Sequence, residues 1–291
     1  MSSSNSSDVG RSRTLIPRAD EPLPTGDDKT QAVQAMFDVI APRYDLVNRV
    51  MTFRMDVGWR RRSVSALGLA PGSMVVDLAC GTGDLSQDLA RRGLVPIGVD
   101  LSYGMLAAAP QPFARLQGDG STMPFPDASV DGATCGFALR NFTDLEGTFA
   151  ELSRIVRPGG RIALLEVATP PNPLLRFGHG IYFGQVVPRI GAALSDGDAY
   201  RYLPRSVQYL PEPDEMLTML ERVGFADVRR TLLSVGIAQL ITGTRSQSAP
   251  TGTRGTNSRP AGATEDGTTG RPAGATESGT TNGSAAGDDP T

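Results

Sequence analysis

The sequence predicts one α/β domain with helices on both faces of a mostly parallel, seven-stranded sheet. Two observations carry this prediction. Apolar runs of strand length alternate with segments of helical apolar periodicity through most of residues 30–245. The last two runs are separated by about one residue, so we expect them to form a hairpin that adds one antiparallel strand.

The elements follow in order along the chain. Apolar spacing predicts helices over residues 31–50 and 57–67, which form an N-terminal helical lid. Strands are expected over residues 74–79, 95–100, 115–117, 129–136, 226–233 and 235–244. One further strand is expected to begin after a turn at Pro158-Gly159-Gly160 and to end at about residue 166. Helices are expected over 84–92, 102–109, 144–156 and 214–223, with N-caps at Ser102 and Asp144 and a C-cap at Gly224. Residues 169–213 are Pro-rich and read as a cap insertion with short helices, which completes a doubly wound, Rossmann-like pattern.

The two ends of the chain are poor material for a core. Residues 1–29 are rich in Ser, Pro, Asp and Arg, and residues 246–291 contain a tandem repeat and no large apolar side chain. Such segments bury too little apolar surface to offset the entropy lost on ordering. We therefore predict disordered tails over 1–29 and 246–291 and a folded domain over 30–245.

Composition narrows the function. A formal net charge of −3 argues against a dedicated nucleic-acid binder. The two cysteines, Cys80 and Cys135, have no metal-ligand spacing, which predicts no metal and favours a reducing compartment. No apolar stretch reads as a secretory signal or a membrane span. We expect a cytoplasmic protein.

A glycine turn follows the first predicted strand, where ligands bind in doubly wound sheets: Gly81-Thr82-Gly83. A dinucleotide site would need glycine or alanine where this chain has Ser86, and Asp84 would repel a pyrophosphate. Carboxylates at Asp77, Asp84 and Asp100 instead suit a ligand with a sulfonium and an amino group, which S-adenosylmethionine carries. The alternative is that the glycines only shape a tight turn and that Asp84 only favours the helix dipole.

A second acidic turn follows the third predicted strand. Asp100 is placed to accept hydrogen bonds from a ribose diol, and Asp119, followed by Gly120, from the exocyclic amine of adenine. The alternative for Asp119 is an ordinary Asx turn.

Three longer stretches resemble one family of class I S-adenosylmethionine-dependent methyltransferases. They are FDVIAPRYDLVNRVMTFRMDVGWRR (37–61), GFALRNFTD (136–144) and DAYRYLPRSVQYLPEPDEMLTML (198–220). They are similar to the quinone-biosynthesis C-methyltransferases, which methylate demethylmenaquinol or the benzoquinol precursor of ubiquinone. The resemblance covers nearly all of residues 30–245 and neither tail.

The resemblance implies cofactor contacts at Thr82, Asp100, Asp119 and Gly120, and at Gly136, where family members have a serine. Where the family commonly has a glycine, this chain has Cys80. The lid helix is expected to place Tyr44 near the methionine end of the cofactor.

The catalytic candidates are less well defined. Arg140 and Asn141 follow the fourth predicted strand, where an arginine can stabilise a quinol oxyanion while the amide orients the ring. The other candidates come from the cap, and for each of them a plain packed loop is the alternative: Asp198, Tyr200, Arg201 and Tyr202. His179 is the only histidine, and the general base stays unassigned.

The function we predict is transfer of a methyl group from S-adenosylmethionine to the ring of demethylmenaquinol, without a metal. A polyprenyl naphthoquinol is the expected partner, and six arginines within residues 43–62 suggest contact with lipid at the inner face of the cell membrane. The alternatives are a polyprenyl benzoquinol, another lipid or polyketide acceptor, or a non-catalytic S-adenosylmethionine-binding module. The oligomeric state is left open.

Overall fold

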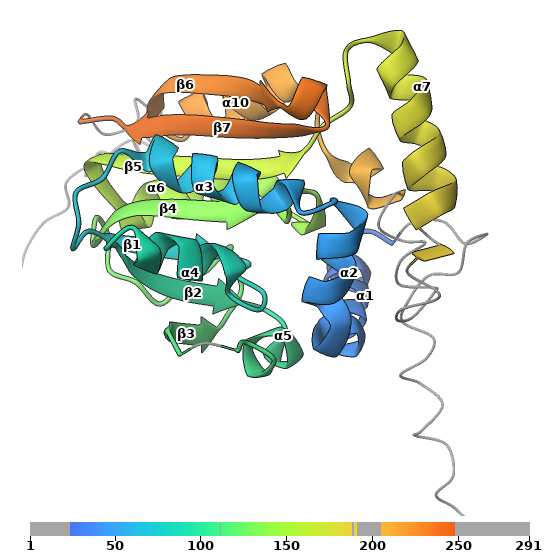
Figure 1. Cartoon of the computed structure of the whole chain (residues 1–291). Helices are drawn as coiled ribbons and strands as arrows, with labels where there is room; N and C mark the ends of the chain where they lie inside the picture. The colour runs from blue at the N-terminus through green and yellow to red at the C-terminus, as the bar shows by residue number, and fades with distance from the viewer. Residues whose placement is uncertain (1–23, 111, 188, 191–204, 248–291) are drawn as a thin grey trace, which may run out of the picture. The chain divides into compact units, whose positions relative to one another are not determined.

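The predicted strands form one seven-stranded sheet within the part of the chain that the computed structural model describes (Figure 1). This part comprises residues 24–110, 112–187, 189–190 and 205–247. All of it belongs to one compact unit, Met1–Thr251. The tail predicted over 1–29 lies mostly outside the described residues, as does all but the first two residues of the tail predicted over 246–291.

The sheet has the strand order β3-β2-β1-β4-β5-β7-β6. Its strands are β1 (Met74–Leu78), β2 (Val95–Asp100), β3 (Ala114–Gln117), β4 (Val130–Gly136), β5 (Val156–Val167), β6 (Phe225–Leu233) and β7 (Ala238–Arg245). The pairs among β1 to β5 are parallel, and β7 runs antiparallel to both β5 and β6. The predicted mostly parallel sheet with one antiparallel strand is confirmed.

Helices cover both faces of this sheet. They are α1 (Gly26–Ile40), α2 (Tyr44–Met51), α3 (Met55–Leu67), α4 (Asp84–Arg91), α5 (Tyr103–Ala107), α6 (Leu145–Ile155), α7 (Pro173–Ile181) and α10 (Pro213–Arg222). Short 3-10 turns lie at η1 (Ala41–Arg43), η2 (Leu139–Asn141), η4 (Val207–Tyr209) and η5 (Ser234–Gly236), and η3 (Tyr182–Val186) is a π-helical turn. The predicted N-caps are confirmed, since the side chain of Ser102 accepts from Met105 N and that of Asp144 from Gly147 N.

Neighbouring residues of β1 explain why its sequence is apolar at every position except Asp77. Val75 packs in one core cluster with Trp59 of α3 and Leu89 of α4. Val76 packs in another cluster with Phe149 of α6 and Leu220 of α10. Because successive strand side chains point to opposite faces, a strand with helices on both sides buries apolar residues on each of its faces.

The N-terminal lid is two helices rather than the one predicted over 31–50. Pro42 lies in the 3-10 turn η1 between α1 and α2, and proline cannot continue a helical hydrogen-bond ladder. The lid also begins earlier than predicted, because α1 starts at Gly26 and the side chain of Lys29 is buried. Met36 and Ile40 of α1 pack with Val47 of α2 in a third apolar cluster.

The turn predicted at Pro158-Gly159-Gly160 is also different, because these residues lie within β5. Gly159 has a φ of +77°, and the pairing of β4 with β5 shifts register between Val130 and Gly132. The glycines therefore form an irregularity inside a longer strand.

The cap insertion contains the predicted short helices. None of the described helices is long and apolar enough to cross a membrane.

Candidate active site

A cavity of about 280 Å³ opens where β1, β2 and β4 end. This is the edge at which a doubly wound sheet holds its ligand, because the carboxyl ends of parallel strands meet there. Seven residues predicted from the sequence line it: Tyr44, Gly81, Asp100, Asp119, Gly120, Gly136 and Asn141. They come from five separate segments of the chain, which the lid, the sheet and η2 bring together.

Asp100, at the end of β2, is held in place by two backbone N–H groups. Its Oδ2 accepts from Gly81 N at 2.7 Å, and its Oδ1 accepts from Ser102 N at 2.8 Å. Burial raises the pKa of this carboxyl above its usual value, and the two N–H groups oppose that shift. Gly81 has a φ of +56°, and an added Cβ would lie 3.0 Å from Met105, so this position favours glycine.

Asp119 forms the Asx turn that was its alternative reading, and it also lines the cavity. Ser121 donates to Asp119 Oδ1 from its backbone N at 2.8 Å and from its Oγ at 2.9 Å. At the next residue, Gly120, an added Cβ would come within 2.8 Å of Leu78 and 2.9 Å of Phe142. The turn thus holds one carboxylate oxygen, and the missing side chain keeps the cavity open.

Three of the predicted cofactor residues do not line this cavity. Asp77 is fully buried and accepts hydrogen bonds from Ser86 Oγ at 2.6 Å and Thr134 Oγ1 at 3.2 Å. Burial raises its pKa to about 7. An added Cβ on Gly83 would lie 2.3 Å from Phe113, and Thr82 contacts the lid instead. These residues shape the turn, and their role as direct contacts stays a prediction.

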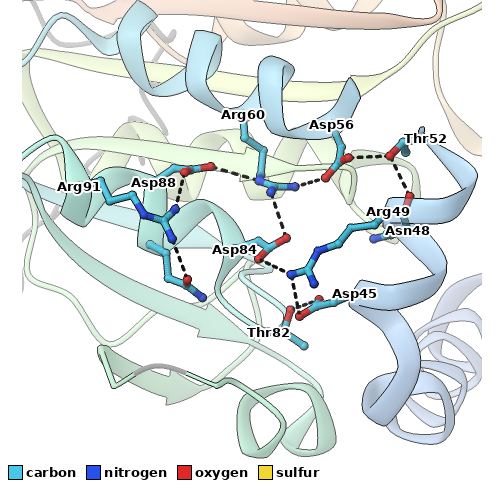
Figure 2. A network of polar contacts seen from close by, with 11 residues as sticks. Asp45, Asn48, Arg49, Thr52, Asp56, Arg60, Thr82, Asp84, Asp88 and Arg91 are labelled. Carbon is cyan, nitrogen blue, oxygen red and sulfur yellow. Dashed lines mark hydrogen bonds and ion pairs between the residues drawn. The ribbon is translucent and has the colours of Figure 1, made fainter. Parts of the chain in front are cut away.

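A network of charged side chains fastens the lid and α3 to this turn (Figure 2). Thr82 Oγ1 donates to Asp45 Oδ1 of α2 at 2.5 Å, and Arg49 lies 3.7 Å from Asp84. Arg60 of α3 is at the centre of the network and pairs with three carboxylates: Asp56, Asp84 at 3.1 Å and Asp88 at 3.3 Å. Asp84 therefore forms ion pairs with Arg49 and Arg60 and does not line the cavity. The sequence reasoning missed Arg60, although its spacing of four residues from Asp56 is a usable signal.

A second, larger cavity of about 400 Å³ lies between the lid and the cap. Its lining comes from α2, α3, α7, η3 and η5 and is mostly apolar and aromatic. The lining includes Met51, Phe53, Met55, Trp59, Val167, Leu174, Leu175, Tyr182, Phe183, Val187, Val207, Val235 and Ile237. Such a lining fits the apolar part of a ligand, with few polar groups to orient it.

Two aromatic residues line both cavities: Tyr44 and Phe137. Phe137 has a φ of 60°, a conformation that a bulky residue rarely adopts and that is often found at functional sites. Burial raises the pKa of the Tyr44 phenol, which keeps it protonated at neutral pH. The two cavities therefore meet at an aromatic wall made by the lid and the loop after β4.

Arg140 lines the second cavity and is fixed by a buried acid that the sequence reasoning missed, Glu166 of β5. Its Nη1 donates to Glu166 Oε1 at 2.5 Å and to Phe137 O at 2.6 Å, and its Nε donates to Ser206 Oγ at 3.1 Å. Among the described residues Nη2 has no hydrogen-bond partner. It therefore keeps donors for a ligand.

Two of the other catalytic candidates, Asn141 and His179, line different cavities. Asn141 lines the first cavity, and its buried Oδ1 has no partner among the described residues. Asp198 and Tyr200 lie outside those residues. His179 lines the second cavity with its ring 4.3 Å from that of Phe183, and burial lowers its pKa. No group of three or more side chains that could hold a metal occurs in the described ranges.

Comparison with known proteins matches this chain to one family. Residues 25–245 match the ubiE/COQ5 methyltransferase family. The chain is 40% identical over 232 residues to the demethylmenaquinone methyltransferase of Roseiflexus castenholzii, covering 77% of this chain and 97% of that protein. It is 42% identical to the enzyme of the same name from Deinococcus radiodurans, with coverage of 76% and 97%. The ubiquinone/menaquinone biosynthesis C-methyltransferase UbiE of Syntrophotalea carbinolica is 41% identical, with coverage of 74% and 95%.

Solved structures support the fold. A methyltransferase of Thermotoga maritima, described as a possible histamine N-methyltransferase, superposes with a TM-score of 0.53 at 18% identity, covering 73% of this chain and 99% of that one. Phosphoethanolamine N-methyltransferase 2 of Haemonchus contortus, with bound S-adenosylhomocysteine, also gives 0.53 at 14% identity, with coverage of 74% and 60%. At these identities the likeness concerns the architecture alone.

Proposed function

The chain belongs to the ubiE/COQ5 methyltransferase family, and from this premise we propose that it methylates the ring of demethylmenaquinol. The methyl group passes from the sulfonium of S-adenosylmethionine to a ring carbon. The ring carbon loses its proton, and the products are menaquinol, S-adenosylhomocysteine and a proton. No metal takes part in this displacement.

The first cavity suits the methyl donor. Asp100 offers carboxylate oxygens fixed by backbone N–H groups, as a ribose diol requires. Asp119 has one oxygen held in its turn and one left for an adenine amine. Gly136 also lines this cavity and, having no side chain, can contact the donor only through its backbone.

The meeting of the two cavities at Tyr44 and Phe137 is the observation that carries the proposal. A donor in the first cavity and an acceptor ring in the second would meet beside these two side chains. Methyl transfer is an in-line displacement, and holding the two reactants in alignment is worth roughly 7–11 kcal/mol. The apolar second cavity also suits a naphthoquinol ring and the start of its prenyl chain.

Within the second cavity, Arg140 is proposed to stabilise the ring oxygen as an oxyanion, which makes the neighbouring ring carbon nucleophilic. Glu166 holds its guanidinium and leaves Nη2 to meet the acceptor. Asn141, Asp198 and Tyr200 stay candidates for orienting the ring. The general base is unassigned, and the lowered pKa of His179 keeps it neutral and able to accept a proton.

The benzoquinol precursor of ubiquinone is the second candidate acceptor. One relative at 41% identity carries both pathways in its name, whereas two at 40% and 42% carry only menaquinone. Both acceptors have a polyprenyl chain, which partitions into lipid. We therefore also propose that the protein works at the surface of the cell membrane.

A methyl-transfer assay tests the function. Wild type, Arg140→Ala and the surface control Arg61→Ala receive labelled S-adenosylmethionine with chemically reduced demethylmenaquinol or the reduced benzoquinol precursor. We expect label in the naphthoquinol product, at least tenfold slower incorporation with Arg140→Ala, and an unchanged rate with Arg61→Ala. Label only in the benzoquinol would move the enzyme to the ubiquinone pathway. Binding of the donor without transfer to either acceptor would overturn the quinone proposal.

A further inference from the structure

The mouth of the second cavity has an apolar rim. Three residues that line this cavity are also strongly exposed: Phe53 at 71%, Leu174 at 78% and Val235 at 66%. They come from the α2–α3 turn, from α7 and from η5. Exposed apolar residues that gather around one opening mark an interaction site rather than ordinary surface scatter.

The backbone presents two of these side chains at a cost in stability. Phe53 and Val235 have φ angles of 50° and 55°, and bulky or β-branched residues rarely adopt this left-handed conformation. Strain of this kind persists where the surrounding structure enforces it, commonly at functional positions. The Phe53 ring lies 5.7 Å from that of Tyr182, which joins the α2–α3 turn to the end of α7.

Helix α7 extends the rim. It stands at the edge of the fold beyond the strand ends (Figure 1), and none of its residues is buried. Leu174, Phe177 and Ile181 share one face by their spacing, and all three are exposed. Leu174 also lines the cavity at its mouth, together with Leu175 and His179 on the other face. A helix that is apolar on both faces requires an apolar environment outside the protein as well as inside.

The charges near the rim identify that environment. Arg54 follows Phe53 and Arg176 precedes Phe177, and both are exposed. Neither forms an ion pair with a described residue, although the guanidinium of Arg176 donates to Pro170 O and Pro171 O, each at 3.1 Å. Residues 168–195 contain no Asp or Glu. Apolar side chains beside arginines that have no acidic partner match a bilayer with anionic headgroups.

We propose that α7 and the Phe53 turn dock on an anionic lipid bilayer, so that the second cavity opens into the membrane. The acceptor ring then enters the cavity while its prenyl chain stays in the lipid. This inference rests on the proposed function, because it assigns the rim to a lipid-borne acceptor. The proposed surface differs from the basic face expected over residues 43–62. Arg60, one of the arginines in that face, pairs with carboxylates within the protein and is not available to lipid.

Vesicle co-sedimentation of the full chain tests the surface without relying on activity. The vesicles are phosphatidylcholine alone or with phosphatidylglycerol. The variant is Phe177→Ser with Ile181→Ser, neither of which lines a cavity, and the control is Leu232→Ser on the outer strand β6, also an exposed apolar residue. We expect wild type and control to bind the phosphatidylglycerol vesicles, and the double variant to bind at least tenfold more weakly.

Two further readouts separate the outcomes. With an acceptor that lacks the prenyl chain, the double variant is expected to keep the wild-type rate, whereas with vesicle-borne acceptor its rate falls in proportion to binding. Equal vesicle binding by all three proteins would overturn the docking surface and leave the proposed function intact. A shift of the wild type from dimer to monomer in the double variant, without vesicle binding by either, would assign the rim to a second copy and also overturn it. Vesicle binding as expected with no methylation of any quinol would overturn the proposed function alone.

Discussion

The hydroxyl of Thr82 donates a hydrogen bond to the carboxylate of Asp45 over 2.5 Å, and this contact joins the glycine turn after β1 to the lid helix α2. Arg49, one helical turn after Asp45, reaches Asp84 just beyond the same turn. The lid is thereby tied to the segment that shapes the floor of the first cavity. Opening the lid must break both contacts, so they should govern how fast the methyl donor is exchanged.

Thr82→Val keeps the shape of the side chain and removes this hydrogen bond. Hydrogen bonds to charged groups contribute roughly 1.5–3 kcal/mol, so we expect S-adenosylhomocysteine to dissociate about tenfold faster. Stopped-flow fluorescence measures this rate. Thr231→Val, on the exposed part of β6, is the matched control and should dissociate at the wild-type rate. Equal rates in both variants would show that the lid is held by other contacts.

Arg60 forms ion pairs with three carboxylates, whereas its neighbour Arg61 is exposed and forms none with a described residue, so the two can be compared directly. Arg60→Ala leaves Asp56, Asp84 and Asp88 close together with less neutralising charge. Breaking a mostly buried pair costs about 3 kcal/mol of unfolding free energy, whereas exposed charges matter little. Urea denaturation should therefore show a large loss for Arg60→Ala and a near wild-type midpoint for Arg61→Ala. Similar midpoints for the two variants would contradict the role of the network.

Glu166→Ala leaves the buried guanidinium of Arg140 without its counter-ion. We expect a loss of about 3–5 kcal/mol in unfolding free energy and a lower kcat, since Arg140 loses its fixed position. The control Glu146→Ala removes an exposed ion pair with Arg222 and should change neither quantity appreciably. Glu166→Gln keeps a hydrogen-bond acceptor and should restore more of the stability than of the kcat. Full activity in Glu166→Ala would show that Arg140 does not depend on this partner.

The buried carboxyl of Asp77 predicts a pH dependence of stability. Burial raises its folded-state pKa to about 7, above the ordinary unfolded value of about 4. Between these values the folded state holds a proton that the unfolded state has released, so its contribution to stability falls as pH rises from about 4 through 7. Denaturation of Asp77→Asn and wild type at several pH values measures this, and the variant should show the flatter profile. Parallel profiles would contradict the assignment.

Much of the fold could be predicted because its signals are local. The mostly apolar sequence of β1, the glycines at positions 81 and 83, and the caps at Ser102 and Asp144 all act within a few residues. The antiparallel β7 followed from the short link to β6. Two predictions from local sequence were wrong. The turn predicted at Gly159 lies inside the longer strand β5, and the single lid helix is divided at Pro42.

The candidate site, like the fold, could be predicted from the sequence only in part. Sequence spacing alone determined a doubly wound sheet with acidic groups at its ligand-binding edge, because parallel strands bring their ends together whatever lies between them. Only the tertiary structure decided that Arg140 pairs with Glu166, that Arg60 engages Asp84, and that Tyr44 and Phe137 line both cavities. Arg60 and Asp84 lie 24 residues apart, and Arg140 and Glu166 lie 26 apart. Such pairs depend on how helices pack across a sheet, and that packing is set by the whole core rather than by any one segment.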